Sequence, residues 1–169
     1  MDTIPVEMFK KEVFGLLDET FERVPQTSAF LDSGTSLFET LATISAEEAS
    51  RPVSPTCASL AAQVEHVRFY LEVMERAILG ESLTQIDWGE IWRTVRAVTP
   101  EQWEDSKSRL MASYRHVRET LSSLPYDHAD HVGGAMNVIV HTAYHLGEIR
   151  QALCTLHETQ RSGVQHGPE

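Results

Sequence analysis

The stretch HTAYHLGEIRQAL, residues 141–153, places two histidines four positions apart in an otherwise apolar segment. Its apolar residues, among them Leu146 and Ile149, recur at intervals of three and four, which predicts an amphipathic helix. With 3.6 residues per helical turn, His141 and His145 lie about 40° apart around this helix and about 6 Å apart along it. Two imidazoles on one face are either polar groups satisfied by their neighbours or two ligands of a metal ion.

The same helical periodicity runs through almost the whole chain of 169 residues, and no segment alternates as a strand would. Proline, glycine and capping residues mark the ends of the apolar stripes. Four long helices are predicted: from Pro5 to Pro25, from about Thr56 to Leu79, from Thr99 to Pro125, and from a start between His128 and Ala135 to about Glu158. This pattern predicts an all-α fold, specifically a four-helix bundle.

Roughly 30 residues connect the first two long helices, which is long for neighbours that pack antiparallel. The sequence therefore predicts a crossover connection between helices 1 and 2. Ser36 with Glu39 and Ser45 with Glu48 form capping boxes, each of which predicts the start of a short helix. The chain length fits a single domain, residues 1–159, and the polar residues 160–169 are predicted to form a flexible tail.

The charge of the chain excludes several classes of function. The net charge is −11, from 25 acidic residues against 14 lysines and arginines. Binding to a nucleic-acid backbone needs clustered positive charge, and the stretch SYRHVR at residues 113–118 is too small a cluster, so no nucleic-acid partner is expected. No apolar run is long enough to cross a bilayer, and the N-terminus carries no secretory signal. We therefore expect no membrane association and a cytoplasmic location.

A third histidine, His66 in QVEHVRFY, lies on the second long helix. Like His141 and His145, it falls at the shoulder of the apolar face rather than at its centre. Side-by-side packing of the two helices would bring the three imidazoles together if the handedness agrees. Three ligands with an open fourth position are typical of catalytic zinc, and imidazole suits nickel, copper and iron as well. Glu148 falls about 20° from His141 on the same strip of the last helix.

The pair His141 and His145 is on its own a weak signal, because two histidines spaced by four are also common at ordinary helix surfaces. The remaining histidines and the two cysteines are expected to have simpler roles. His128 and His131, with Asp127 and Asp130, form a second cluster that we expect to be solvated, and His116, His157 and His166 are scattered over polar faces and the tail. Cys57 and Cys154 have no CxxC spacing and are predicted to be small buried apolar side chains.

The order of these features resembles the DinB/YfiT-like superfamily of four-helix-bundle proteins, over roughly residues 5 to 158. The features are QVEHVRFYL, a tryptophan-bearing segment, the helix opened by TPEQW, and HTAYHLGEIRQAL. The resemblance implies a divalent metal ion bound by His66, His141 and His145, with zinc or nickel first and iron or manganese as alternatives. Many members have glutamine where this chain has Glu148. This carboxylate could accept a hydrogen bond from a ligand N–H, act as a general base, or be a solvated charge on the helix surface.

The resemblance also implies two functions. One is a metal-dependent enzyme of the thiol-transferase or isomerase type, or a hydrolase, acting on a small molecule with a low-molecular-weight thiol as a second substrate. The alternative is a non-catalytic metal-binding bundle protein of a stress response. Dimers are common in the superfamily, so a homodimer is expected. Trp88 and Trp92 are either an apolar surface for the partner or a cap on one end of the bundle.

Overall fold

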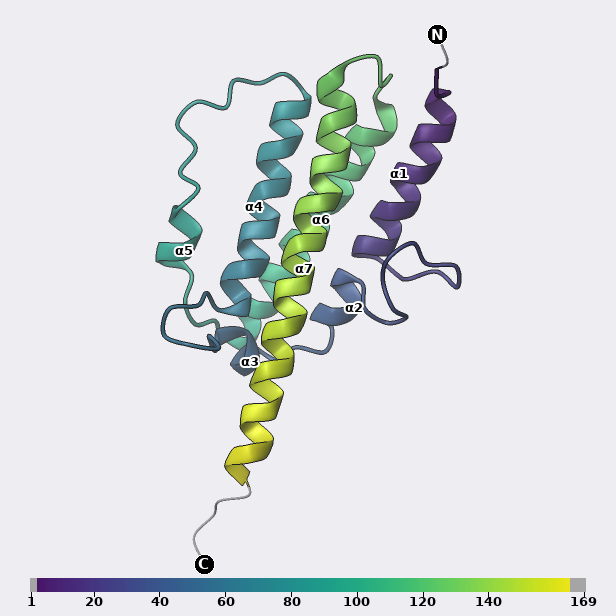
Figure 1. Ribbon diagram of the computed structural model, residues 1–169. Helices are drawn as coiled ribbons and strands as arrows, with labels where there is room; N and C mark the ends of the chain where they lie inside the picture. Colours follow the sequence, from purple (N-terminus) through teal and green to yellow (C-terminus); the bar gives the residue numbers. More distant parts are fainter. Residues whose placement is uncertain (1–2, 165–169) are drawn as a thin grey trace, which may run out of the picture.

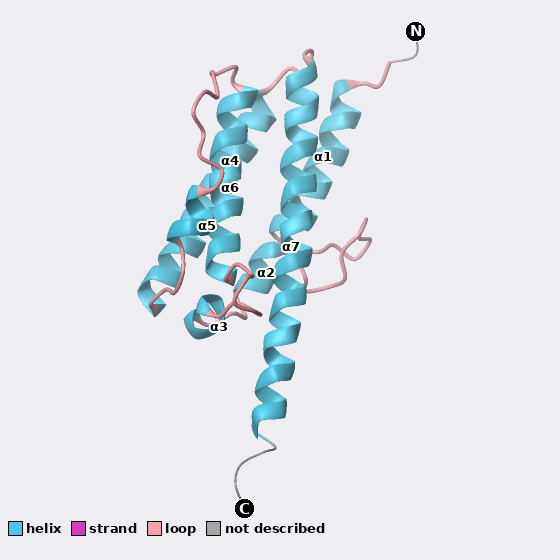
Figure 2. Ribbon diagram, turned by 60° about the vertical axis from the view of Figure 1, so that its left-hand side comes forward, coloured by secondary structure: helices cyan, strands magenta, loops and turns pink. Residues whose placement is uncertain are grey.

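The structure, a computed structural model, describes residues 3–164, and the side chains as far as residue 158. Helices are the only regular secondary structure in that part of the chain, which confirms the predicted all-α class (Figures 1 and 2). None of them is both long enough and apolar enough to span a membrane. Their bounds are α1 Val6–Phe21, α2 Leu37–Leu41, α3 Ala46–Ser50, α4 Leu60–Ile78, α5 Glu90–Thr94, α6 Pro100–Ser123 and α7 Ala129–Val164.

The start of α6 agrees with its sequence signal in detail. The Thr99 hydroxyl accepts a hydrogen bond from the Gln102 N–H, and the Gln102 side chain accepts one from the Thr99 N–H. Pro100 occupies the first helical position, where an N–H would have no partner within the helix. The helix ends at Ser123, before Pro125 as predicted.

Three other boundaries differ from the prediction. Helix α1 ends at Phe21, four residues before the predicted stop at Pro25. Helix α4 begins at Leu60 rather than near Thr56, because the Ser59 hydroxyl accepts a hydrogen bond from the Ala62 N–H and caps the helix there. Helix α7 runs to Val164, past the predicted end, since no proline interrupts it. The first residues of the predicted tail are therefore helical, and residues 165–169 lie outside the described residues.

The four long helices lie side by side (Figure 1). Helix α4 packs along both α6 and α7, and α1 packs against α7. Phe21 at the end of α1 also stacks on Tyr114 of α6, with ring centroids 4.3 Å apart. Helices α6 and α7 thus lie between α1 and α4.

Each long helix turns its apolar stripe towards a common core. On α1, Leu17 is fully buried and Leu16 only partly. Full burial of such a side chain stabilises the fold by about 1.5–3 kcal/mol. The largest fully buried side chains are Trp103, Tyr114, Phe21, Leu17, Leu37, Leu41, Leu60, Leu71, Leu110, Leu121, Leu146 and Ile149.

Helices α4 and α7 approach closely at Gly134. A Cβ atom at this position would lie 2.3 Å from Cγ1 of Ile78 and 2.8 Å from its Cδ1, closer than such atoms can come. Ile78 is 4% exposed and branched at Cβ, so its side chain has little freedom to move aside. The glycine therefore permits the short distance between the two helices.

Glu19 fixes the start of the connection between α1 and α4. Its carboxylate is 2% exposed and accepts hydrogen bonds from the backbone N–H groups of Ala29, Phe30 and Leu31, each at 2.7 Å. Burial on its own raises the pKa of Glu19, but the three hydrogen bonds favour the charged form and bring the pKa below its ordinary value. The loop thus supplies the polar partners that the buried carboxylate requires.

The short helices of this connection begin at the two predicted capping boxes. The side chains of Ser36 and Ser45 each accept a hydrogen bond from the backbone N–H of the glutamate three residues further on. The side chain of each glutamate in turn accepts a hydrogen bond from the backbone N–H of its serine. Between these helices, the Ile44 carbonyl accepts a hydrogen bond of 2.7 Å from the indole N–H of Trp103. That bond joins the connection to α6.

Candidate metal centre

Three histidine side chains converge where α4 packs against α7. His66 comes from α4, and His141 and His145 come from successive turns of α7. The His66 ring centroid lies 5.2 Å from that of His141 and 4.7 Å from that of His145, and the two α7 rings are 4.6 Å apart. Each ring offers one nitrogen, and these nitrogens all lie within 4.8 Å of one another. The three histidines that the sequence singled out therefore form one cluster.

The cluster is buried more deeply than a shoulder position suggests. His66 is 7% exposed and His145 is 5% exposed, while His141 is partly buried. The ring of Trp92, from α5, lies 4.4 Å from the His66 ring, and the Tyr70 ring stacks on His141 at 3.5 Å. These aromatic side chains cover the imidazoles and keep water from much of their surface.

Two ring nitrogens in the cluster have no hydrogen-bond partner in the described part of the chain. They are His66 Nδ1 and His141 Nε2, and both atoms are buried. A buried nitrogen without a partner costs about 1–3 kcal/mol, so native proteins rarely keep one without a reason. Two such atoms in one cluster of three histidines are a reason to expect a bound ligand there.

All three imidazoles favour the neutral form. Burial lowers the pKa of His66 and that of His141 to about 4, and the neighbouring imidazoles add electrostatic repulsion in the same direction. Burial also lowers the pKa of His145, although Glu148 favours its charged form. Since a metal ion binds neutral imidazole, the environment prepares the three rings for coordination at neutral pH.

Two acceptors set the orientation of His145. Its Nδ1 lies 2.7 Å from Oε1 of Gln63 and 2.9 Å from Oε2 of Glu148. Both are oxygen acceptors, so Nδ1 carries the proton and Nε2 keeps its lone pair for a metal ion. The other carboxylate oxygen of Glu148 accepts a hydrogen bond from the Tyr144 hydroxyl at 2.7 Å. Both oxygens of Glu148 are therefore engaged in positioning.

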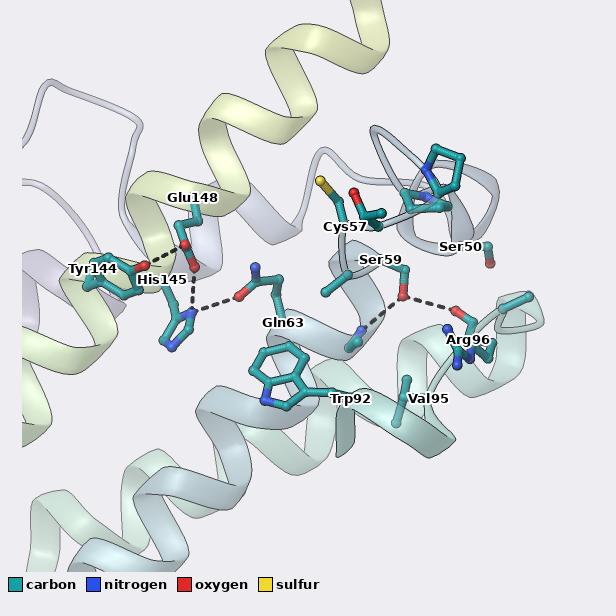
Figure 3. Close-up of a pocket in the computed structure, with 16 residues that line it drawn as sticks. Ser50, Cys57, Ser59, Gln63, Trp92, Val95, Arg96, Tyr144, His145 and Glu148 are labelled. Carbon is teal, nitrogen blue, oxygen red and sulfur yellow. Dashed lines mark hydrogen bonds and ion pairs between the residues drawn. The ribbon is translucent and has the colours of Figure 1, made fainter. Parts of the chain in front are cut away.

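A pocket of about 610 Å³ opens beside this cluster (Figure 3). His145, Glu148 and Gln63 line one part of it, and Trp92 lies across its middle. Pockets of this size commonly bind small molecules. Of the three histidines only His145 lines this cavity, so the cavity meets the cluster at that side chain.

The residues present fit a divalent metal ion. The donor set consists of three neutral imidazoles, two of them with buried nitrogens that nothing else satisfies. A carboxylate on the remote nitrogen of one ring is the usual support of a metal-bound histidine. Imidazole donors suit zinc, nickel, copper and iron alike, so the donor set leaves the choice of ion open.

The other described histidines lie apart from this cluster, which is the only group of its kind between residues 3 and 158. His128 Nδ1 lies 3.2 Å from an Asp130 oxygen, and His131 Nδ1 lies 3.4 Å from an Asp127 oxygen. The rings of His128 and His131 lie 5.7 Å apart at the start of α7, and His131 is partly buried while the other three residues are exposed, as predicted for a solvated cluster. His166 falls outside the described residues.

The two cysteines contradict their prediction, because both are exposed rather than buried. Cys57 lies in the loop before α4, since that helix starts at Leu60 rather than near Thr56. It lines the pocket, and the Ser54 hydroxyl donates a hydrogen bond to its Sγ at 3.1 Å. Cys154 lies on a face of α7 that no other helix covers.

The two tryptophans have different roles. Trp92 packs on His66 and lines the pocket, so it belongs to the site. Trp88 is 43% exposed and packs edge-on against Phe69 at 5.7 Å. Only Trp88 therefore remains free for a partner surface, and the homodimer stays a prediction.

Three residues of the site were not assigned a role from the sequence, and a fourth, Trp92, was expected at a partner surface or at one end of the bundle. Gln63 and Tyr70 lie three residues before and four residues after His66, and Tyr144 lies four residues before Glu148, so helical spacing carried a usable signal. Trp92 reaches the cluster from another helix, and nothing local in its sequence indicates this contact.

The chain was also compared with known proteins. The comparison gives no match to a family model, to a curated protein or to a solved structure. The resemblance to the DinB/YfiT-like superfamily therefore stays a prediction.

Proposed function

We propose that this protein binds a divalent metal ion through His66, His141 and His145 and is a metal-dependent enzyme acting on a small molecule. We further propose that its long helices form the four-helix bundle, with the crossover connection, of the DinB/YfiT-like superfamily. The observation that carries the proposal is the cluster of three neutral imidazoles, with two unsatisfied buried nitrogens, beside a pocket. Zinc or nickel is the first choice of ion, with iron or manganese as alternatives.

The reaction that we favour is transfer or isomerisation with a low-molecular-weight thiol as a second substrate. A divalent ion supplies the chemistry by keeping a thiol or a water molecule deprotonated near neutral pH. His145 is held in the tautomer that leaves Nε2 free, and Trp92 and Tyr70 limit the access of water. Because both oxygens of Glu148 are engaged, we assign it to positioning His145 rather than to general-base catalysis.

The alternative is a metal-binding protein of a stress response without catalysis. Structural zinc sites are four-coordinate and closed, whereas catalytic sites keep a position for substrate. The pocket of about 610 Å³ that reaches His145 and Glu148 favours an open site. This opening is the reason to place the enzyme first.

Metal content tests the binding part of the proposal. The wild-type protein and the variants His66→Ala and His145→Ala are purified and their metal content is measured by elemental analysis. We expect the wild type to retain about one ion per chain and both variants to lose it while remaining helical by circular dichroism, since catalytic zinc sites commonly use three protein ligands. His116→Ala, whose side chain is 78% exposed, is the matched control and should retain the metal. Full metal content in both variants would rule out these ligands.

A thiol-transfer screen tests the catalytic part. The protein is incubated with a panel of electrophiles and a low-molecular-weight thiol, before and after removal of the metal with a chelator. We expect turnover that disappears with chelation and returns when the ion is added back. A protein that binds one ion per chain tightly but shows no turnover with any electrophile would favour the non-catalytic alternative.

A further inference from the structure

The pocket beside the metal centre has two chemically different ends. His145 and Glu148 lie at one end, and Arg96 lies at the other, with Trp92 between them (Figure 3). Much of the remaining wall is apolar, from proline, alanine and valine side chains. Ser50, Thr56, Cys57, Ser59 and Gln63 also line the pocket, but its charged side chains lie at its two ends.

Arg96 is the only lysine or arginine among the described residues that line the pocket. In the part of the chain that the structure describes, its exposed guanidinium has no hydrogen bond and no ion pair. Arg93, three residues earlier, is paired with Asp87. The only acidic residue in the pocket lining is Glu148, and its two oxygens are held by His145 and Tyr144. In a chain with a net charge of −11, Arg96 is thus a free cation facing a cavity.

The backbone that carries Arg96 is held in place. The Ser59 hydroxyl donates a hydrogen bond of 3.0 Å to the Arg96 carbonyl oxygen, and the Val98 N–H donates one of 2.9 Å to the Ser50 hydroxyl. These bonds fix the segment after α5 to the start of α4 and to the end of α3. The amino end of α4 lies in the same wall and adds partial positive charge there. The protein therefore holds a positively charged end of the pocket in a defined position.

We infer that the pocket binds a small molecule with a carboxylate at one end, which pairs with Arg96, and an apolar middle part that lies against Trp92. The opposite end of this molecule, directed towards His145, carries the group that reacts. An arginine pairs with a carboxylate through two parallel hydrogen bonds, which a neutral amide cannot reproduce with the same strength. The inference rests on the proposed function, because that function makes the pocket a substrate site.

Binding of a matched pair of ligands to the metal-free protein tests the Arg96 end alone. Phenylbutyrate and phenylbutyramide share the aromatic ring and the chain length and differ in charge. Their affinities are measured by isothermal titration calorimetry on chelator-treated wild type, Arg96→Gln and Arg93→Gln. We expect the acid to bind the wild type about tenfold more tightly than the amide, a difference typical of one charge-assisted contact.

The variants separate a specific contact from general attraction. Arg93→Gln removes the same charge from the same region but outside the pocket lining, so the preference for the acid should remain. Arg96→Gln should bind the two ligands equally. Equal affinities in the wild type, no binding of either ligand, or a preference that survives in Arg96→Gln would overturn the inference. Arg96 is exposed, and circular dichroism checks that its replacement leaves the helices intact.

A second pair of ligands distinguishes failure of this inference from failure of the metal centre. Mercaptohexanoate and hexanoate are compared on the zinc-loaded and the metal-free wild-type protein. We expect the thiol to gain about tenfold or more in affinity only when zinc is present, since thiolate is a preferred zinc ligand. Loss of this gain, with the acid preference at Arg96 intact, would count against the metal centre alone. The reverse result would count against the carboxylate site alone.

Discussion

Glu19 and the histidine cluster are both buried polar sites on long helices, but only one of them is satisfied by the protein. The Glu19 carboxylate accepts three backbone N–H groups at 2.7 Å. At the cluster, His66 Nδ1 and His141 Nε2 have no partner in the described residues. The protein therefore supplies hydrogen bonds to the buried carboxylate of Glu19, but supplies none to these two histidine nitrogens.

The pKa values express the same difference. The pKa is lowered at both sites, but for an acid this means a stabilised ion and for a histidine a destabilised one. Glu19 favours the charged form and is held by backbone N–H groups, whereas the buried or partly buried imidazoles favour the neutral form. We therefore interpret Glu19 as a structural group and the histidine cluster as a candidate binding site for a ligand.

The largest expected effect is on the cluster, where a metal ion should stabilise the folded state. A ligand present at a thousandfold excess over its Kd raises the free energy of unfolding by about 4 kcal/mol. We expect zinc or nickel to raise the Tm of the wild type and of Glu19→Gln, but not that of His145→Ala. Thermal unfolding with and without the ion measures this. If none of the candidate ions changes the Tm of the wild type, the histidine cluster does not bind a metal ion, and the proposed difference from Glu19 is wrong.

The next largest effect is the loss in the free energy of unfolding when the Glu19 carboxylate is removed. Glu19→Ala leaves three backbone N–H groups without their acceptor, and partial access of water to that loop limits the cost to about 3 kcal/mol. Urea unfolding of the metal-free protein measures it. Glu12→Ala, an exposed position on the same helix, is the control and should change the free energy of unfolding by less than about 0.5 kcal/mol. An equally small loss in Glu19→Ala would show that the loop is not held by this side chain.

The acceptors on His145 should affect metal affinity without abolishing binding. Gln63→Ala and Glu148→Ala each remove one oxygen from Nδ1, and loss of such a partner typically weakens metal binding about 10- to 100-fold. Competition with a chelator of known affinity measures the Kd. Gln151→Ala, an exposed position one turn further along α7, should leave the Kd unchanged. Unchanged affinity in both test variants would separate these residues from the metal centre.

The smallest effect is the pH dependence that Glu19 contributes. Its pKa in the folded protein is below the ordinary value of 4.5, so its stabilisation is fully present above that pH and is lost as the pH falls through the lowered pKa. Each unit of lowering corresponds to about 1.4 kcal/mol. The difference in unfolding free energy between wild type and Glu19→Gln should therefore shrink as the pH falls below about 4.5. A difference that stays constant into acid would mean that hydrogen bonding rather than charge carries the effect.

Much of the helical framework follows from the sequence because its signals are local. The cap formed by Thr99 and the stripe of buried residues on each long helix depend on neighbours within a few positions. The start of α4 does not, because the Ser59 hydroxyl also bonds to the distant Arg96 carbonyl. The exposure of Cys57 follows from that shift, and could not be predicted from its own surroundings.

The candidate site divides in the same way. The spacing of His141 and His145 is a property of one helix, so their common face was predictable. Their meeting with His66 depends on how two helices pack, which the sequence left conditional. The covering of His66 by Trp92 depends on a third segment, and the sequence carries no signal for it.

The close approach at Gly134 has a consequence for the histidine cluster. A methyl group at this position would meet Ile78, so that α4 and α7 could not keep their present distance there without a shift. Gly134 lies about two helical turns from His141 and belongs to the same helix pair that carries the three imidazoles. The spacing of the two helices that bring these rings together is thus set partly by a residue that has no side chain.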